Sequence, residues 1–198
     1  MKTFQSGVTL VELMVTIAIL AILAGVAAPS LSHLMMTNRL ASQTNGIMAA
    51  LTVARAEAIR RNQRVVACRY DGIAANGSVP ATFSCDAGGG DWTGVVVFND
   101  SNANNARDAG EDLIKAERFD TGKTTIRASA QIAALSNAVV FRGDGIARDN
   151  TGGFLNSGQI RICTPDAGSD NARDIALRGG GKTVLSKASD STCGAPND

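Results

Sequence analysis

Aromatic residues are scarce in this chain: they make up 4% of its 198 residues, with one Trp and one Tyr. Without rows of aromatic side chains, stacking on nucleic-acid bases is not supported. The formal net charge is +1, so the whole chain has no strong electrostatic attraction to nucleic acid or to a membrane surface. Histidine occurs once, as His33, and no Ser/His/Asp set assembles around it, so we expect no enzyme.

Charge is also nearly absent from the N-terminal part of the chain. Between Val8 and Ala28 the only charged residue is Glu12, and this run of 21 residues is long enough to cross a bilayer as a helix. An ordinary secretory signal has a shorter apolar region and a more basic start than this chain, whose only basic residue before the apolar run is Lys2. A plain membrane anchor explains the length but not the carboxylate, which is costly in a membrane and usually functional.

A third interpretation accounts for the polar start, the glycine and the carboxylate together. Met1–Gly7 (MKTFQSG) is a short polar leader that ends in Gly, and VTLVELMVTIAILAILAGVAAP follows it. This pattern resembles the signal of type IV prepilins and type II secretion pseudopilins. The resemblance implies that a prepilin peptidase of the inner membrane cuts between Gly7 and Val8 and N-methylates Val8, which stands where the family usually has Phe. The apolar helix, residues 8–29, would then stay on the mature protein.

Glu12 gains a physical role in this interpretation. After cleavage, Val8 carries a free amine, and the apolar N-terminal helices bundle inside a filament. The carboxylate of one helix then pairs with the amine at the start of a neighbouring helix, because a pair costs less in an apolar core than either charge alone. We therefore expect Glu12 to set the register of one subunit against the next during assembly.

The residues after the apolar run continue a helical pattern. Pro29 stands where pilin helices commonly kink, because Pro removes one intrahelical hydrogen bond. Residues 30–62 form an amphipathic helix whose apolar side chains repeat at a spacing of three or four. The members of this stripe are Leu31, Leu34, Met35, Met48, Leu51, Ala54, Ala58 and Ile59.

From residue 63 to residue 198 the pattern changes to short β runs separated by Gly, Asn and Asp, with no second amphipathic helix. We predict an α+β fold of the type IV pilin kind, in which the long N-terminal helix packs on an antiparallel β-sheet domain. The predicted strands lie within residues 64–70, 94–100, 112–119, 124–128, 137–145, 159–164, 173–178 and 182–186.

Four cysteines, Cys68, Cys85, Cys163 and Cys193, lie in this β-rich part. A zinc site is disfavoured, because the spacings contain no CxxC pair and the one His lies in the helix. Since the resemblance implies export to an oxidising compartment, we expect disulfides. Proximity in the sequence favours Cys68 with Cys85 and Cys163 with Cys193, among three connectivities.

One acidic segment fits the spacing of a calcium-binding loop. In DSNANNARDAGE, the oxygen-bearing residues at positions 1, 3, 5, 9 and 12 of that pattern are Asp100, Asn102, Asn104, Asp108 and Glu111. Asn105 replaces the usual Gly, and the flanks are strands instead of helices. The alternative is a solvated acidic loop between strands, and we expect no other cofactor.

A basic cluster straddles the end of the predicted helix and consists of Arg55, Arg60, Arg61, Arg64 and Arg69. Favourable charge at a helix C-terminus explains it more simply than a patch for DNA or an acidic partner. The resemblance to pilins weakens the DNA interpretation further. Some minor pilins carry a C-terminal GRxR motif for DNA, and the matching stretch here, Gly181-Lys182-Thr183-Val184, has one basic residue.

The later motifs narrow the resemblance. The stretches WTGVVVFNDSN, ARDAGEDLI, VVFRGDG, IRIC and ARDIALRGGGK, together with the N-terminus, resemble the GspH/FimT family of minor pilins and pseudopilins. This implies a low-abundance type IV pilus subunit that primes or joins assembly, near the tip. The alternatives are a GspH-type pseudopilin of type II secretion and a DNA-binding minor pilin.

The same resemblance implies where the protein acts and what it meets. The partners would be the prepilin peptidase, membrane lipid before assembly, the inner-membrane assembly platform, and other pilins in the filament. DNA is not favoured as a partner. The chain would cross the bacterial inner membrane once, with its globular domain in the periplasm, before it enters the pilus or pseudopilus.

Overall fold

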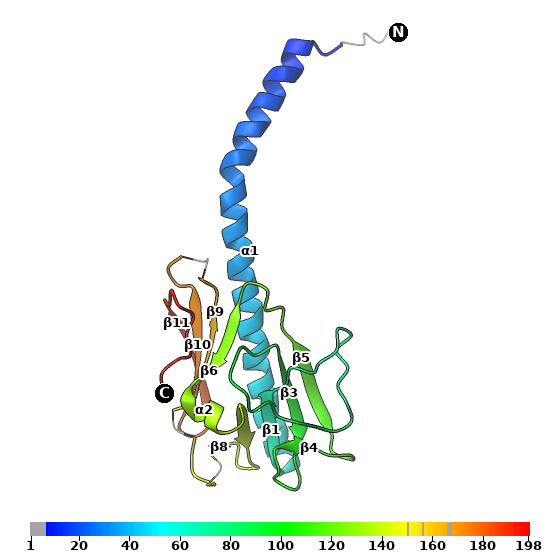
Figure 1. Ribbon diagram of the computed structural model, residues 1–198, viewed down its shortest axis with the longest axis vertical. Coiled ribbons are helices and arrows are strands. Elements are labelled where there is room, and N and C mark those ends of the chain that lie inside the picture. The colour runs from blue at the N-terminus through cyan, green and yellow to red at the C-terminus, as the bar shows by residue number, and fades with distance from the viewer. Residues whose placement is uncertain (1–6, 150, 156, 166–167) are drawn as a thin grey trace.

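The computed structural model describes residues 7–198, except residues 150, 156 and 166–167 and the side chains of residues 26–30 (Figure 1). One helix, α1, runs from Leu10 to Arg61. Thr9 caps its N-terminus, and Asn62 ends it in a left-handed conformation that Asn tolerates well. The two predicted helical segments are therefore one continuous helix, whose N-terminal half projects away from the domain along a gentle curve (Figure 1).

Two predictions involve residues 26–30, whose side chains lie outside the described part of α1. One is the expected kink at Pro29. The other is the membrane-spanning segment 8–29, and both stay predictions. Across the described residues, no helical stretch reaches the combination of length and apolar character that membrane crossing requires.

The larger sheet has five strands in the order β5-β3-β1-β7-β8, and each neighbouring pair is antiparallel. Its strands are β1 (Val65–Arg69), β3 (Gly94–Asn99), β5 (Leu113–Arg118), β7 (Ala138–Phe141) and β8 (Ala147–Arg148). Every residue of β1, β3 and β7 is buried. These central strands are buried on both faces, which explains why they are continuous apolar runs without alternation.

The smaller sheet has four antiparallel strands in the order β11-β10-β9-β6. They are β6 (Thr125–Ala128), β9 (Gln159–Cys163), β10 (Ala172–Arg178) and β11 (Lys182–Ala188). The eight predicted strands are all present, so the α+β prediction is confirmed. The structure adds a short pair, β2 (Phe83–Ser84) with β4 (Ala106–Arg107), the short β8, and a five-residue helix, α2 (Ala130–Ala134). The sequence predicted no second amphipathic helix and did not predict α2, because five residues are too few for helical periodicity to show.

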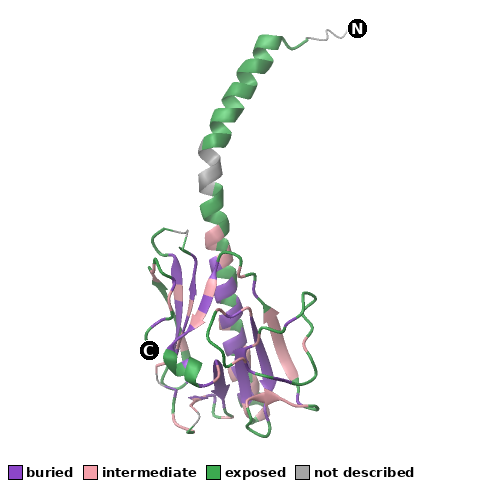
Figure 2. Ribbon diagram, viewed as in Figure 1, coloured by how far each residue is buried: buried purple, intermediate pink, exposed green. Residues whose placement is uncertain are grey.

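The C-terminal half of α1 packs against both sheets and forms the core with them (Figure 2). Ala50, Ala54 and Ala58 are completely buried and repeat every four residues, so they share one face of the helix. Their small side chains allow the helix backbone to approach β1 and β3 closely. A second cluster, which includes Val66, Phe98 and Phe83, fills the opposite face of the larger sheet.

Candidate functional site

The described side chains in the N-terminal half of α1 form an apolar surface that is exposed in the single chain. From Val8 to Leu23 the large apolar residues are between half and three quarters exposed, and their positions are distributed around the whole helix. Figure 2 shows this part of the helix coloured as exposed. A helix that is apolar all round is normally buried, in a membrane or among other helices. An exposed surface of this extent therefore indicates an interaction site.

The first turn of this helix contains a cap that the sequence analysis did not identify. The Thr9 hydroxyl accepts a hydrogen bond from the backbone N–H of Glu12, at 3.2 Å. Thr at the cap with Glu three residues later is the spacing of a capping box, and this pattern directly before an apolar run was the signal that could have revealed it. Glu12 also lies in the first turn, where a negative charge is favourable near the positive end of the helix dipole.

Gly7 and Val8 lie just before this cap, and both are exposed. Val8 is 73% exposed, and an added side chain at Gly7 would meet no atom within 4 Å. The predicted cleavage bond is therefore accessible, and nothing in the fold itself requires glycine at position 7.

The four cysteines form two disulfides, Cys68–Cys85 and Cys163–Cys193, the pairs that sequence proximity favours. The first joins β1 to the segment after β2, and the second joins the end of β9 to the C-terminal tail. The Cα atoms are 5.8 and 5.4 Å apart, within the usual range for a disulfide. Both bonds attach loops to sheets, so they stabilise the domain.

The predicted calcium loop, residues 100–111, is organised by its own hydrogen bonds. Asp100 is completely buried and receives the guanidinium of Arg64 and the backbone N–H groups of Asn104 and Asn105, at 3.2 and 2.9 Å. Asn105 adopts the left-handed φ of 59° for which the pattern uses Gly. The positive charge of Arg64 thus occupies the position beside Asp100 that a cation would take.

The other predicted ligands are also satisfied within the loop. Glu111 accepts from Ser101 N–H at 2.7 Å and from Asp108 N–H at 3.0 Å. Burial raises the pKa of Glu111, but these bonds outweigh it and hold the pKa below its usual value. The side-chain amides of Asn102 and Asn104 donate to Asp108, at 2.7 and 2.8 Å. Among the described residues, no group of three or more His, Cys, Asp or Glu side chains is placed to hold a metal ion.

Each arginine of the basic cluster at the end of α1 has a hydrogen-bonding or ion-pair partner within the domain. Arg60 and Arg61 both pair with Glu57, and their hydrogen bonds lower its pKa to about 2. Arg61 also pairs with Asp112 at 2.6 Å. The remaining members have partners as well: Arg55 donates to the carbonyl of Gly181, Arg64 pairs with Asp100, and Arg69 pairs with Asp71. This pairing supports the structural explanation of the cluster over a patch for DNA.

The C-terminal tail has a polar centre, Asp190, that the sequence analysis did not single out. Its carboxylate accepts from Thr192 N–H at 2.9 Å, from Gly194 N–H at 3.1 Å and from Arg161 at 2.7 Å. Hydrogen bonds from Thr192 are the main reason that its pKa falls to about 2. Asp190 therefore holds the tail against β9 beside the second disulfide.

Two protein families match this chain. Residues 43–181 match the family described as type II transport protein GspH, and residues 2–28 match the prokaryotic N-terminal methylation motif. The pilin-like protein PilA1 of Thermus thermophilus is 35% identical over 136 residues, which cover 67% of this chain and 72% of that protein.

The fold is similar to crystal structures of the type IV minor pilin FimU of Pseudomonas aeruginosa. In space group P21 the TM-score is 0.52 at 15% identity, covering 78% of this chain and 96% of FimU. In space group P65 it is 0.50 at 14% identity, covering 77% and 99%. At this identity the likeness shows a common fold alone.

Proposed function

The chain belongs to the GspH family of type IV pilin-like proteins, and from this premise we propose that it is a minor pilin, a low-abundance subunit that primes or joins a type IV filament near its tip. One observation carries the proposal. The apolar half of α1, whose described side chains are exposed in the single chain, lies largely within the residues that match the N-terminal methylation motif, and it extends from a folded β-rich domain. The role is structural, and we assign no catalysis to the chain.

The apolar half of α1 has two successive environments in this proposal. Before assembly, residues 8–29 lie in the bacterial inner membrane, with the domain in the periplasm. A prepilin peptidase removes Met1–Gly7 and methylates the new amine of Val8. An assembly platform then moves the helix from lipid into the filament core, where the apolar helices of other pilins cover it.

Glu12 directs the transfer into the filament. Its carboxylate lies in the first turn of α1, close to the end of the helix where the mature chain begins. In an apolar filament core, the carboxylate pairs with the terminal amine of a neighbouring subunit, because each charge alone would be costly there. The pair forms in only one axial register, so the site aligns subunits as well as attracting them.

A second candidate is a pseudopilin of type II secretion. It is favoured by the matched family, whose description is a type II transport protein, over residues 43–181. Both candidates use the same processing, the same helix and the same role for Glu12. They differ in the machine that the subunit serves.

A deletion strain complemented with the full chain separates these candidates. We expect the chain in sheared surface filaments, with an intact mass that lacks Met1–Gly7 and carries one added methyl group. If the deletion strain without the complementing gene makes normal filaments but does not secrete exoproteins, the chain is a pseudopilin instead. Retention of the leader, or cleavage after Ala28, would contradict both.

The substitution Gly7→Val tests the processing step within the same strain. Because a side chain at position 7 meets nothing in the folded chain, loss of cleavage would reflect the peptidase and not misfolding. Gly25→Ala is the matched control, since position 25 is equally open and lies within the retained helix. We expect normal processing of the control.

A further inference from the structure

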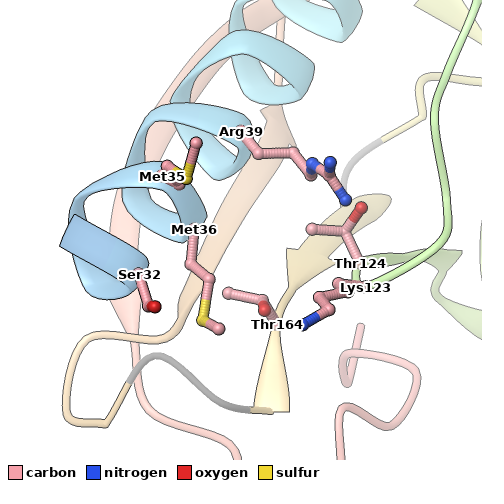
Figure 3. A pocket seen from close by; sticks show the side chains of 7 residues that line it. All are labelled: Ser32, Met35, Met36, Arg39, Lys123, Thr124 and Thr164. Atoms are coloured by element: carbon pink, nitrogen blue, oxygen red, sulfur yellow. The ribbon is translucent and has the colours of Figure 1, made fainter. Parts of the chain in front are cut away.

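A pocket lies where α1 leaves the domain, between the helix and the ends of the smaller sheet (Figure 3). Its volume is about 210 Å³. The helix contributes Met35, Met36 and Arg39, and the domain contributes Lys123, Thr124 and Thr164. Leu40, the next residue of α1, is completely buried, so the pocket lies at the boundary between the covered and the bare parts of the helix.

Thr164 is the residue that points to a ligand. It is 0% exposed and directly follows β9, and its hydroxyl has no hydrogen-bond partner among the described residues. Its backbone N–H is satisfied by the carbonyl of Asn171 at 3.0 Å, so only the side chain lacks a partner. Buried hydroxyls are almost always hydrogen-bonded, and this one lines a cavity that can hold an acceptor.

The charge of the lining selects an anion. Arg39 and Lys123 both line the pocket, and no described carboxylate does. Arg39 also contacts Asp120 through one nitrogen at 3.1 Å, which leaves its other guanidinium N–H groups available as donors. Figure 3 shows Thr164 between the side chains of Met36 and Lys123. Two cations with nearby hydroxyls are the donors that a phosphate group prefers.

The apolar part of the pocket indicates where that phosphate comes from. Leu31, Leu34 and Met35 are 57%, 54% and 66% exposed, so α1 exposes apolar residues directly beside the pocket. Met35 belongs both to these exposed apolar residues and to the lining of the pocket. When this surface lies in a bilayer, the pocket opens where apolar acyl chains meet their phosphates.

We propose that this pocket binds the phosphate of an anionic phospholipid, with Arg39, Lys123 and the Thr164 hydroxyl as donors and Met36 against the glycerol and first methylenes. The inference rests on the proposed function, because it requires the helix in a membrane before assembly. The bound lipid sets the height of the domain above the bilayer. It is released when the helix enters a filament.

Native mass spectrometry of the full, processed chain in detergent tests the proposal. The probes are phosphatidylglycerol and phosphatidylcholine with identical acyl chains, and inorganic phosphate as a competitor. We expect preferential retention of phosphatidylglycerol. Thr164→Val should weaken it about three- to ten-fold, as the loss of one hydrogen bond does, and Thr164→Ser should restore it. Lys123→Ala should weaken it about five-fold.

Lys182→Ala is the matched control, because Lys182 is exposed on β11 and does not line the pocket. Equal retention of both lipids, or wild-type retention by Thr164→Val, would overturn the proposal. Displacement of the lipid by millimolar inorganic phosphate would show a site for free phosphate instead, and a cross-link from Lys123 to another pilin in the membrane would show a subunit contact.

The presence of Thr164→Val in sheared filaments is measured separately. If this variant enters filaments while lipid selectivity is absent in the wild type, the lipid site fails and the minor-pilin role stands. Absence of the wild type from filaments would count against the role itself. Unchanged thermal unfolding of Thr164→Val shows that a loss of lipid is not a loss of fold.

Discussion

Residues at the start of α1 affect the protein in two ways, through the cap of the helix and through the charge of Glu12. The Thr9 cap stabilises the start of α1, and Glu12 lies three residues later in the same turn. A change at Glu12 can therefore act through the helix end or through the charge. The two effects are separable, because Glu12→Gln keeps the backbone N–H that the Thr9 hydroxyl caps and removes only the charge.

We expect Glu12→Gln to enter the membrane normally and to be incorporated poorly into filaments, because it lacks the partner for a neighbour's terminal amine. Thr9→Ala should cost the helix about 0.5–2 kcal/mol through the lost cap, while it retains the charge and much of the incorporation. Immunoblots of membrane and sheared-filament fractions measure both. Normal incorporation of Glu12→Gln would remove the carboxylate from the assembly mechanism.

Among the elements, α1 determines how closely the two sheets pack around it. The three buried alanines at positions 50, 54 and 58 form a smooth ridge, and the larger residues Leu40, Ile47 and Leu51 fill the core beside it. The domain thus depends on small side chains at these positions, since larger ones would separate the helix from β1 and β3.

We expect Ala54→Leu to destabilise the domain by about 1–3 kcal/mol, the usual cost of overpacking a filled core. Thr52→Leu adds a similar side chain to an exposed position of the same helix and is the control. Thermal unfolding of the two variants decides the matter. Equal melting temperatures of the two variants would show that the interface between α1 and the sheets can accept a larger side chain at position 54.

The loop between β3 and β5 is a second element whose stability has a definite source. Asp100 is completely buried, and the side chain of Arg64 is 18% exposed, so the pair is largely shielded from water. Burial lowers the pKa of the Arg64 guanidinium, because the charged form loses part of its hydration. Removing one partner of such a pair leaves the other charge buried without compensation.

We expect Arg64→Ala to destabilise the domain by about 3–5 kcal/mol. Arg60→Ala should destabilise the domain far less, because its side chain is 64% exposed and water screens its ion pair. Millimolar calcium should leave the melting temperature of the wild type unchanged, because Arg64 already neutralises Asp100. A rise in melting temperature that Asp100→Ala and Glu111→Ala both abolish would establish the loop as a calcium site.

At the scale of the whole molecule, a disulfide-bonded domain is joined to a helix whose N-terminal half is exposed. Two disulfides close the loops of the domain, and on the chain-entropy model each contributes about 3–4 kcal/mol. The second one acts together with Asp190, which accepts hydrogen bonds from the tail and from Arg161 on β9. The tail is thus held by a covalent bond and by a carboxylate that must stay ionised.

The pH dependence of stability follows from this arrangement. The pKa of Asp190 is lowered to about 2 in the fold, so its contribution is complete above its usual value of 3.8 and is lost as the pH falls towards 2. We expect the free energy of unfolding to fall across this window and to fall less in Asp190→Asn. Denaturant unfolding at pH 5 and pH 2 measures both. Since Glu57 titrates in the same window, only the difference between wild type and variant reports on Asp190. Identical pH dependence in the two chains would exclude the role.

The sequence by itself determined the features that depend on local pattern. A long apolar run with one carboxylate predicted the exposed apolar half of α1. Continuous apolar runs such as residues 94–100 predicted the strands, because the spacing of apolar residues along a short segment indicates its secondary structure. Proximity along the chain was sufficient to favour the two cysteine pairs that the structure contains.

Only the tertiary structure decided which polar groups meet. Arg64 and Asp100 are 36 residues apart in the sequence, and spacing suggested a metal ligand at Asp100 where the fold provides an arginine. Asp71 and Asp112 neutralise two members of the basic cluster, Arg69 and Arg61. Thr164 faces Met36 and Lys123 because β9 ends beside α1. Spacing along one segment indicates what a side chain can bind, but the packing of distant segments determines which partner lies beside it.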